Sequence, residues 1–351
     1  MTCLGIRGFR DRDFLSTKEG FIFCAVGPYH PNDRAIGYLK YVPAPEGRWR
    51  RGKTRFRRVM PTYTIASLLE TFNILRSSYP QYLFLSPVYN ITMTAVPRKD
   101  MVKHYKPEEK LAELFKKSRL DSLQKKAVGL VSSLSKLSNV PPNNFGITGS
   151  VLLDIHNPVF SDIDITIYGV ENSHTVKDAV KGAFREGSSG VDRFGREKLK
   201  QWCLNKTQNH RISLADAKKI YGRRWNIGVF DETSFSMHPV KLEEELKEKY
   251  GDKTYYPAGT VTVRAVVVDS LDSIFLPAVY GVEEVEIESI NVNIKEVVSY
   301  EGLYDSLADK GETIEAKGKL EHVLDNRTGE KYDRVLVGSP EGKGKEYIKP
   351  I

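Results

Sequence analysis

The stretch Phe145–Tyr168, FGITGSVLLDIHNPVFSDIDITIY, decides how this chain is expected to fold. After residue 161 apolar and polar residues alternate, which predicts a strand with isoleucines facing a core and Asp162 and Asp164 on the opposite face. The Gly149-Ser150 pair predicts a tight turn, because glycine permits close backbone approach and serine can cap the short helix that follows. The expected order is strand, turn, short helix and strand.

The two acidic residues on the second strand suggest the chemistry. Carboxylates at positions i and i+2 of one strand lie about 6.5–7 Å apart, and two like charges this close favour a neutralising cation. Mg²⁺ (or Mn²⁺) is the expected cofactor, because Mg²⁺ prefers few carboxylates together with waters and substrate phosphates. The Gly149-Ser150 turn offers backbone N–H groups to a phosphate. A triphosphate at the turn and a metal at Asp162 and Asp164 together predict nucleotidyl transfer.

This spacing resembles the signature of a known superfamily. Gly149-Ser150, eleven further residues and then Asp162-Ile163-Asp164-Ile165 resemble the motif of the polymerase-β-like nucleotidyltransferases. The whole chain is also similar, more loosely, to the uncharacterised predicted nucleotidyltransferases of archaea. The resemblance implies that Asp162 and Asp164 are the catalytic metal ligands and that Gly149 and Ser150 hold the terminal phosphates of an NTP. It also implies a third acidic residue on a later, neighbouring strand, where it would help to bind the metal and activate the attacking hydroxyl.

That third acidic residue is not evident in the sequence. Residues 225–230 and 234–240 are expected to form a hairpin, with Asp231 at its turn and His238 in the middle of its second strand. Asp231 and His238 are the candidate catalytic residues here, although histidine is often structural as well as a base or ligand. Arg223, just before the hairpin, is a candidate ligand of the triphosphate. Its alternative role is that of a cation at a helix C-terminus, favoured by the helix dipole.

Charge and composition divide the chain into three expected domains of an α+β protein. The net charge is +10 in residues 1–105 (17 basic, 7 acidic), +5 in 106–258 (25 basic, 20 acidic) and −7 in 259–351 (11 basic, 18 acidic). The first is expected to be a small α+β domain and the second a nucleotidyltransferase core with a mixed sheet. The third, with several short strands and few helices, is expected to be an all-β barrel of OB type.

The densest cationic run lies in the first of these domains. Residues 48–58, RWRRGKTRFRR, interleave arginines with two aromatic residues. Arginine suits bidentate phosphate contact and aromatic rings offer stacking platforms for bases, so RNA or DNA is the expected acceptor. The alternative is a solvated hairpin or loop. The candidate nucleic-acid-binding residues are Arg50, Arg51, Arg55, Arg57 and Arg58.

Other features of the sequence narrow the class of protein. No stretch approaches about 18 consecutive apolar residues and the N-terminus lacks an apolar signal segment, so a cytoplasmic protein without a membrane partner is expected. The three cysteines are far apart, which argues against a zinc ribbon or a disulfide framework. Two alternative functions remain open: a weak or inactive core that serves as a nucleotide- or RNA-binding scaffold, and transfer to a protein or small-molecule hydroxyl. The sequence indicates no oligomeric state.

Overall fold

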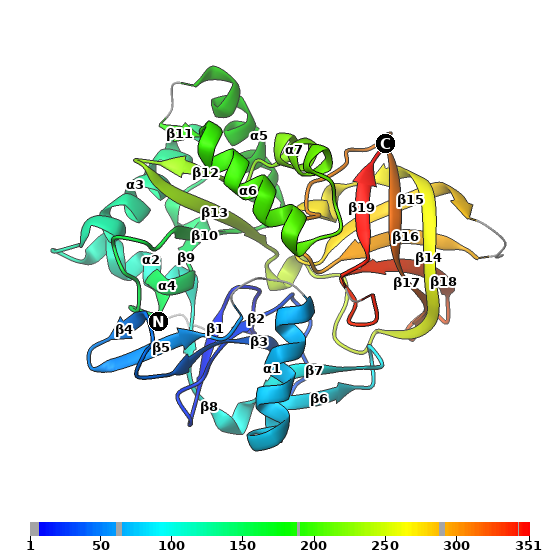
Figure 1. Cartoon of the computed structure of the whole chain (residues 1–351), viewed down its shortest axis with the longest axis horizontal. Helices are drawn as coiled ribbons and strands as arrows, with labels where there is room; N and C mark the ends of the chain where they lie inside the picture. The colour runs from blue at the N-terminus through cyan, green and yellow to red at the C-terminus, as the bar shows by residue number, and fades with distance from the viewer. Residues whose placement is uncertain (1–6, 61–64, 188–189, 288–291, 343) are drawn as a thin grey trace.

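Three sheets, one in each third of the chain, form the framework of the computed structural model (Figure 1). The structure describes residues 7–60, 65–187, 190–287, 292–342 and 344–351. Seven α-helices lie within these ranges, so helices and sheets are combined, as expected. None of the helices in these ranges is long and apolar enough to cross a membrane.

The first sheet is antiparallel and has eight strands. Six follow the order β4-β5-β3-β2-β1-β8, β7 also pairs with β3, and β6 pairs with β7. Its long central strand β3 buries eight of its ten residues, which places this strand between two packed layers. A single helix, α1 (Ile65–Ser78), accompanies the sheet. The strands are β1 (Phe14–Thr17), β2 (Ile22–Ala25), β3 (Arg34–Pro43), β4 (Trp49–Arg51), β5 (Thr54–Arg58), β6 (Leu83–Ser86), β7 (Ile91–Pro97) and β8 (Met101–Tyr105).

The second sheet is mixed, in the order β11-β12-β13-β10-β9, and only β10 and β13 pair in parallel. The isoleucines of β10 are buried in one core with side chains from α3 and α5, as the alternation predicted. The strands are β9 (Phe145–Ile147), β10 (Ile163–Tyr168), β11 (Val191–Asp192), β12 (Ile227–Phe230) and β13 (Thr233–Val240). The helices are α2 (Pro107–Lys116), α3 (Ser122–Ser138), α4 (Gly149–Leu152), α5 (Val170–Glu186), α6 (Arg196–Asn209) and α7 (Leu214–Arg223).

The third sheet closes into a five-stranded barrel, which confirms the predicted β-barrel. Its order is β14-β15-β16-β18-β17, and β17 pairs back onto β14. Only β16 and β18 run parallel, and β19 adds to β17. The strands are β14 (Lys253–Asp269), β15 (Ala278–Ile287), β16 (Ile294–Ser299), β17 (Thr313–Asp325), β18 (Lys331–Val337) and β19 (Tyr347–Pro350).

The β15 region differs from the sequence expectation. The sequence pattern by itself predicts two strands there, Ile274–Tyr280 and Val285–Ile290, whereas one strand spans residues 278–287 and residues 288–291 lie outside the described ranges. Gly281 lies within this strand opposite Asp269, where an added Cβ would come within 3.1 Å of the Asp269 side chain. A close cross-strand neighbour, and not a turn, therefore accounts for this glycine.

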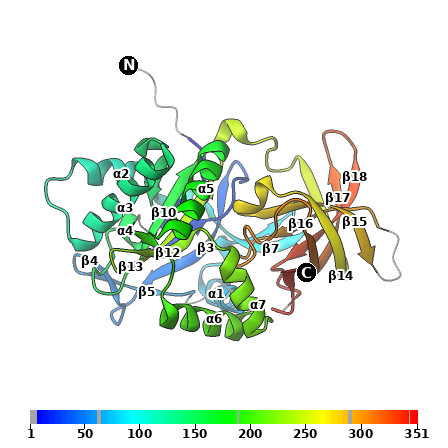
Figure 2. The same cartoon turned by 90° about the horizontal axis from the view of Figure 1, so that it is seen from above.

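The three sheets share their cores at the points where they meet. Leu152, Leu153 and Ile155, from α4 and the residues after it, are buried together with Phe14 and Tyr41 of the first sheet. Side chains of α6 and α7 are buried in the core of the barrel. Figure 1 shows these helices between the middle sheet and the barrel, and Figure 2 shows them along one edge of the molecule. The arrangement of the sheets is therefore fixed by apolar contact as well as by the connecting chain.

Candidate functional site

A cavity of about 680 Å³ lies where the three sheets meet. The first sheet contributes Trp49 and Arg58 to its wall, the second contributes Gly149 and Asp164, and the barrel contributes the segment after β18, residues 338–340. Cavities of about 300–1,000 Å³ are typical of sites for small molecules and cofactors. The predicted turn and the predicted acidic strand thus line the same cavity.

The Gly149 turn and Asp164 are in direct contact. Gly149 has a φ of +65°, a conformation that favours glycine. A Cβ atom at this position would lie 2.1 Å from Asp164 Oδ2, so any larger residue would displace the carboxylate. The backbone N–H of Thr148 donates to the carbonyl oxygen of Asp164 at 2.9 Å. The expectation that Ser150 caps the helix is wrong: α4 begins at Gly149, Thr148 is its N-cap, and no side chain caps it. Ser150 is the second residue of α4, is buried, and also lines the cavity.

Asp162 and Asp164 have pKa values that move in opposite directions. The negative charge of Asp164, followed by burial, raises the pKa of Asp162 to about 6. Burial also acts to raise the pKa of Asp164, but the contact with His238 and the positive charge of Lys40 outweigh it and hold that pKa below its ordinary value. The pair therefore favours one negative charge at Asp164 and disfavours the second at Asp162, unless a cation is added.

This pair gives an expected pH dependence. The pKa of Asp162 is higher in the folded chain than the ordinary value of about 3.9, so its contribution to apoprotein stability is present below about pH 4 and is lost as the pH rises through about 6. A divalent cation needs the deprotonated carboxylate, so we expect Mg²⁺ affinity to increase over the same interval. Mg²⁺ titrations followed by thermal melting at pH 5 and pH 7 measure this difference.

Asp162→Asn should remove most of that pH dependence while leaving the protein folded. Equal Mg²⁺ affinity of the parent protein at pH 5 and pH 7 would contradict the assignment of Asp162.

The neighbouring strand β13 carries a hydroxyl and an imidazole where the resemblance implied a third acid. Parallel pairing places Ser236 opposite Asp164 and His238 opposite Thr166. Ser236 Oγ donates to Asp164 Oδ1 at 2.5 Å, and His238 Nε2 lies 2.9 Å from Ser236 Oγ. The single hydroxyl proton goes to the carboxylate, so His238 Nε2 must donate its hydrogen to Ser236. Within the described ranges no group of three or more histidine, cysteine or acidic side chains is placed to hold a metal ion.

His238 is neutral at physiological pH. Burial, followed by the charge of Arg12, lowers the pKa of its imidazole to about 4. A neutral imidazole fits the tautomer that the Ser236 contact requires. The hydrogen bonds from His238 to Ser236 and from Ser236 to Asp164 therefore orient the Asp164 carboxylate within the cavity.

Two of the other sequence candidates are engaged away from the cavity. Asp231 lies at the turn between β12 and β13, its side chain is 64% exposed, and its carboxylate is 3.5 Å from the Lys126 ammonium on α3. Arg223, at the end of α7, donates from Nη2 to Glu312 Oε1 at 3.0 Å. Its neighbour Arg224 is the residue that lines the cavity.

Lys40 is a cavity residue that the sequence reasoning did not include. It lies on β3, is 5% exposed, and its ammonium is 5.0 Å from the centroid of the Phe14 ring. Its positive charge acts to lower the pKa values of both Asp162 and Asp164. The signal available in the sequence was a lysine inside the apolar run Ile36–Val42, a place where charge is rare without a specific role.

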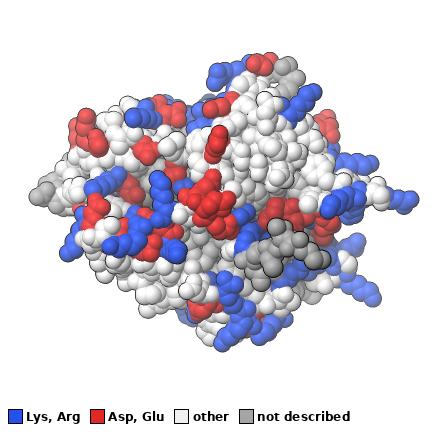
Figure 3. Space-filling view, turned by 180° about the vertical axis from the view of Figure 1, so that it is seen from behind, with Lys and Arg blue, Asp and Glu red and all other residues white. Residues whose placement is uncertain are grey.

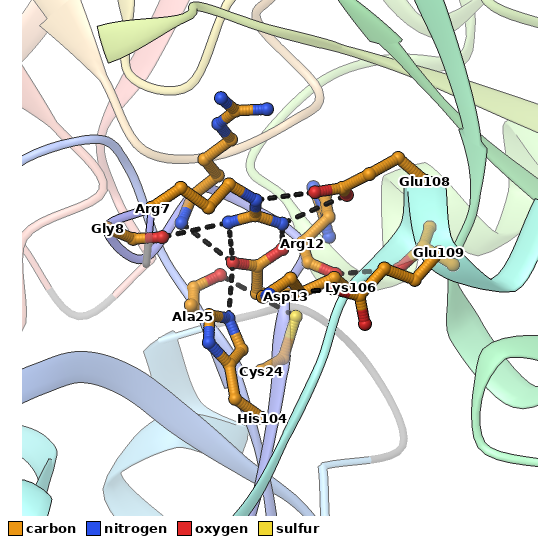
Figure 4. A network of polar contacts seen from close by, with 12 residues as sticks. Arg7, Gly8, Arg12, Asp13, Cys24, Ala25, His104, Lys106, Glu108 and Glu109 are labelled. Atoms are coloured by element: carbon orange, nitrogen blue, oxygen red, sulfur yellow. Dashed lines mark hydrogen bonds and ion pairs between the residues drawn. The ribbon is translucent and has the colours of Figure 1, made fainter. Parts of the chain in front are cut away.

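Arg12 is a second cavity residue that was missed, and a network of polar contacts fixes its backbone. Figure 4 shows Arg7 between Asp13 and Glu108, with Nη2 at 2.8 Å from Asp13 Oδ1 and 2.9 Å from Glu108 Oε2. On the other side of Asp13, Oδ2 is 2.7 Å from His104 Nε2. Thr148 Oγ1 donates to the carbonyl oxygen of Arg12 at 2.7 Å. The residues before β1 are thus tied to the turn beside Gly149.

The arginine-rich run forms the hairpin β4–β5, and strand alternation divides its arginines. Arg50 and Arg55 are directly paired across the hairpin and both are exposed, as is Arg57. Like charges placed opposite each other destabilise a hairpin unless an anion is near. Arg51 is exposed as well but donates to the Tyr105 hydroxyl at 2.9 Å, and the half-buried Arg58 lines the cavity.

Charge on the face opposite to that of Figure 1 is mixed. Figure 3 shows lysines and arginines beside aspartates and glutamates over the described part of this face. Among the residues described, this face therefore shows no continuous cationic surface.

Comparison with known proteins yields one informative relative. No protein-family model matches the chain, and no solved structure matches it. The uncharacterized protein MJ1086 of Methanocaldococcus jannaschii is 32% identical over 345 residues, which cover 97% of this chain and 98% of that protein. The alignment therefore includes the first sheet, the Gly149–Asp164 region and the barrel.

Proposed function

We propose that this chain, which belongs to the same family as the uncharacterized protein MJ1086 of Methanocaldococcus jannaschii, is a Mg²⁺-dependent nucleotidyltransferase of the polymerase-β-like type. It would transfer a nucleoside monophosphate from an NTP to an acceptor hydroxyl and release pyrophosphate. The contact between the Gly149 turn and Asp164 carries this proposal, because it brings a phosphate-binding backbone against a metal-binding carboxylate inside one cavity. The mixed sheet, in which β9 and β13 flank β10, supports the same reading.

Asp162 and Asp164 fit a divalent cation such as Mg²⁺ or Mn²⁺. Their mutual repulsion, visible in the raised pKa of Asp162, is relieved by a cation. Mg²⁺ commonly takes only one or two carboxylates and completes its shell with waters and substrate phosphates, so two acidic residues suffice for binding. When bound, the ion neutralises charge and polarises the reacting phosphoryl group.

The chain's own residues hold the substrates. Backbone N–H groups at Gly149 and Ser150 face the phosphates, and Lys40 and Arg58 add positive charge at the same cavity. His238, with a pKa near 4, is too weak a base for efficient proton transfer at neutral pH. We therefore assign it to positioning, through Ser236, of the Asp164 carboxylate.

Binding of an NTP tests this function. A thermal-shift series with each of the four NTPs, with and without Mg²⁺ or Mn²⁺, should show stabilisation that requires both partners. Pyrophosphate release on addition of an acceptor then separates an enzyme from the alternative of an inactive nucleotide-binding scaffold. If no NTP binds in a metal-dependent way, both the enzyme and the nucleotide-binding scaffold are contradicted.

RNA or DNA is the acceptor class that the arginine hairpin supports. Replacing Arg50, Arg55 and Arg57 by glutamine should weaken oligonucleotide binding and reduce the slope of log affinity against log salt by about 0.7–0.9 per lost phosphate contact. Mg²⁺-NTP binding should be unchanged, because these three side chains are exposed on the hairpin. Fluorescence anisotropy at several salt concentrations measures the slope.

A matched control removes three exposed cations elsewhere, by Lys116→Gln, Lys117→Gln and Arg119→Gln at the end of α2 and just after it. If the control lowers affinity as much as the hairpin variant, the effect is one of net charge alone. If the parent protein binds no oligonucleotide, a protein or small-molecule acceptor takes precedence.

A further inference from the structure

The cavity is also lined by charged groups on the side of the barrel, which we call its barrel end. This end is lined by Trp202, Lys206 and His210 of α6 and the residues just after it, by Arg224 after α7, and by Ser339 after β18. It lies against the barrel, where α6 and α7 share the barrel core. Neither the metal pair nor the phosphate turn of the proposed function uses these residues.

Arg224 is buried with part of its hydrogen-bonding capacity unused. It is 8% exposed, its Nη1 is 3.1 Å from Asp305 Oδ2, and the same Nη1 donates to the carbonyl oxygen of Gly302. Its Nε has no hydrogen-bond partner among the described residues. A buried charged donor without an acceptor destabilises the folded protein. A ligand with acceptor oxygens in the cavity would satisfy it.

Lys206 is the second cation of this end. Within the described ranges it forms no ion pair, and its ammonium lies 5.5 Å from the centroid of the Trp202 ring. The negative charges of Glu301 and Asp305 nevertheless act on it and favour its charged form. His210, one turn further along the chain, has its own partner in Glu301 at 2.9 Å. Burial, followed by the positive charge of Arg224, lowers the pKa of Lys206 to about 8. Both cations therefore line the cavity; Arg224 is paired with Asp305, whereas Lys206 has no ion-pair partner within the described ranges.

We propose that this end of the cavity binds a phosphate group of the acceptor, held by the Lys206 ammonium and the Arg224 guanidinium. Arginine offers planar, bidentate contact and lysine a point charge, which together suit the oxygens of a phosphate. The inference rests on the proposed function, in which the NTP phosphates occupy the Gly149 end. The acceptor phosphate belongs either to a nucleic-acid strand or to a small phosphorylated molecule, and both present the same chemistry to these two side chains.

A structural role is the competing explanation for Lys206. It lies in the last turn of α6, where a cation is favoured by the helix dipole without any ligand. A purely structural lysine would affect stability and leave anion binding unchanged. Binding of an anion is therefore the measurement that separates the two roles.

The experiment uses the full chain and inorganic phosphate as the probe. Calorimetric titration with phosphate, in the presence of Mg²⁺ and a saturating non-hydrolysable NTP analogue, should show binding that Lys206→Gln weakens about tenfold, equivalent to about 1.4 kcal/mol. Lys200→Gln, an equal change at an exposed lysine of the same helix, should leave the affinity unchanged. The affinity for the NTP analogue itself should be the same in all three proteins.

Three results would overturn the proposal. The first is phosphate affinity in Lys206→Gln equal to that of the parent, and the second is an equal loss in Lys200→Gln. The third is competition between phosphate and the NTP analogue, which would assign Lys206 and Arg224 to the triphosphate. Failure of the proposed function has a different signature, since phosphate would then bind through Lys206 to a protein that does not bind Mg²⁺-NTP.

Displacement of phosphate identifies its source. Glycerol 3-phosphate and a 5′-phosphorylated oligonucleotide serve as competing probes, each tested against the parent and Lys206→Gln. Lys206-dependent competition by glycerol 3-phosphate alone supports a small phosphorylated acceptor, and competition by the oligonucleotide alone supports a nucleic-acid strand. Competition by neither probe would overturn the acceptor assignment.

Discussion

Replacing both Asp162 and Asp164 by asparagine is expected to abolish Mg²⁺-dependent NTP binding and to reduce nucleotidyl transfer by about a thousandfold or more, the equivalent of several kcal/mol of lost metal stabilisation. The fold should survive, because asparagine preserves the shape of each side chain. At position 164 the amide oxygen would still accept from Ser236, where the aspartate now accepts at 2.5 Å. Removing the charge of Asp162 relieves repulsion, whereas removing that of Asp164 loses its favourable interactions with His238 and Lys40, so the apoprotein should remain about as stable as the parent. Thermal melting with and without Mg²⁺-NTP, together with a pyrophosphate assay, measures all three quantities.

The matched control for this double variant also removes two carboxylates. Glu171→Gln with Asp178→Asn does so on the exposed side of α5, and it should leave Mg²⁺-NTP binding intact. If the Asp162 and Asp164 variant binds Mg²⁺-NTP as tightly as the parent, the metal site lies elsewhere.

Gly149→Ala is expected to have the second largest effect. The φ of +65° disfavours any residue with a Cβ, and that Cβ would lie 2.1 Å from Asp164 Oδ2. We expect a loss of about 1–3 kcal/mol in the free energy of unfolding and, because Asp164 must move, loss of Mg²⁺-dependent NTP binding. Denaturant unfolding and the thermal-shift assay report the two effects separately.

Gly182→Ala on α5 is the control, because an added Cβ meets nothing within 4 Å there. Alanine in a helix interior should instead stabilise the protein, by up to about 1 kcal/mol. Unchanged NTP binding in Gly149→Ala would refute the role of this turn.

Local patterns predicted the elements around Gly149 and Asp164 well. Alternation on β10 is a short-range feature, and strand, short helix and strand occur in the predicted order, although Gly149 and Ser150 begin the helix instead of forming a turn before it. The closed barrel followed equally from short strands separated by turn residues. Such elements are determined by periodicity and turn chemistry, which neighbouring residues in the sequence encode.

The rest of the cavity depends on contacts between distant segments. Lys40 reaches the acidic pair from more than a hundred residues away, through the packing of the first sheet on α4. The arginine run indicated a basic segment, but which arginines face the cavity is set by the pairing of β4 with β5. Helix α6 buries only Cys203 among its 14 residues. Its sequence therefore has no helical spacing of apolar residues from which its ends, or the face that lines the cavity, could be predicted.

The apolar contact between α4 and the first sheet has a consequence for how this protein can be divided or recombined. Leu152, Leu153 and Ile155 form one core with side chains such as Phe14 and Tyr41. A fragment beginning at residue 106 would expose that apolar surface to water and invite aggregation. The segment that carries Gly149 would also lose the support on which its conformation rests. The first third of the chain and the acidic strand must therefore stay together. A gene fusion or domain exchange that separated them would not give a folded protein.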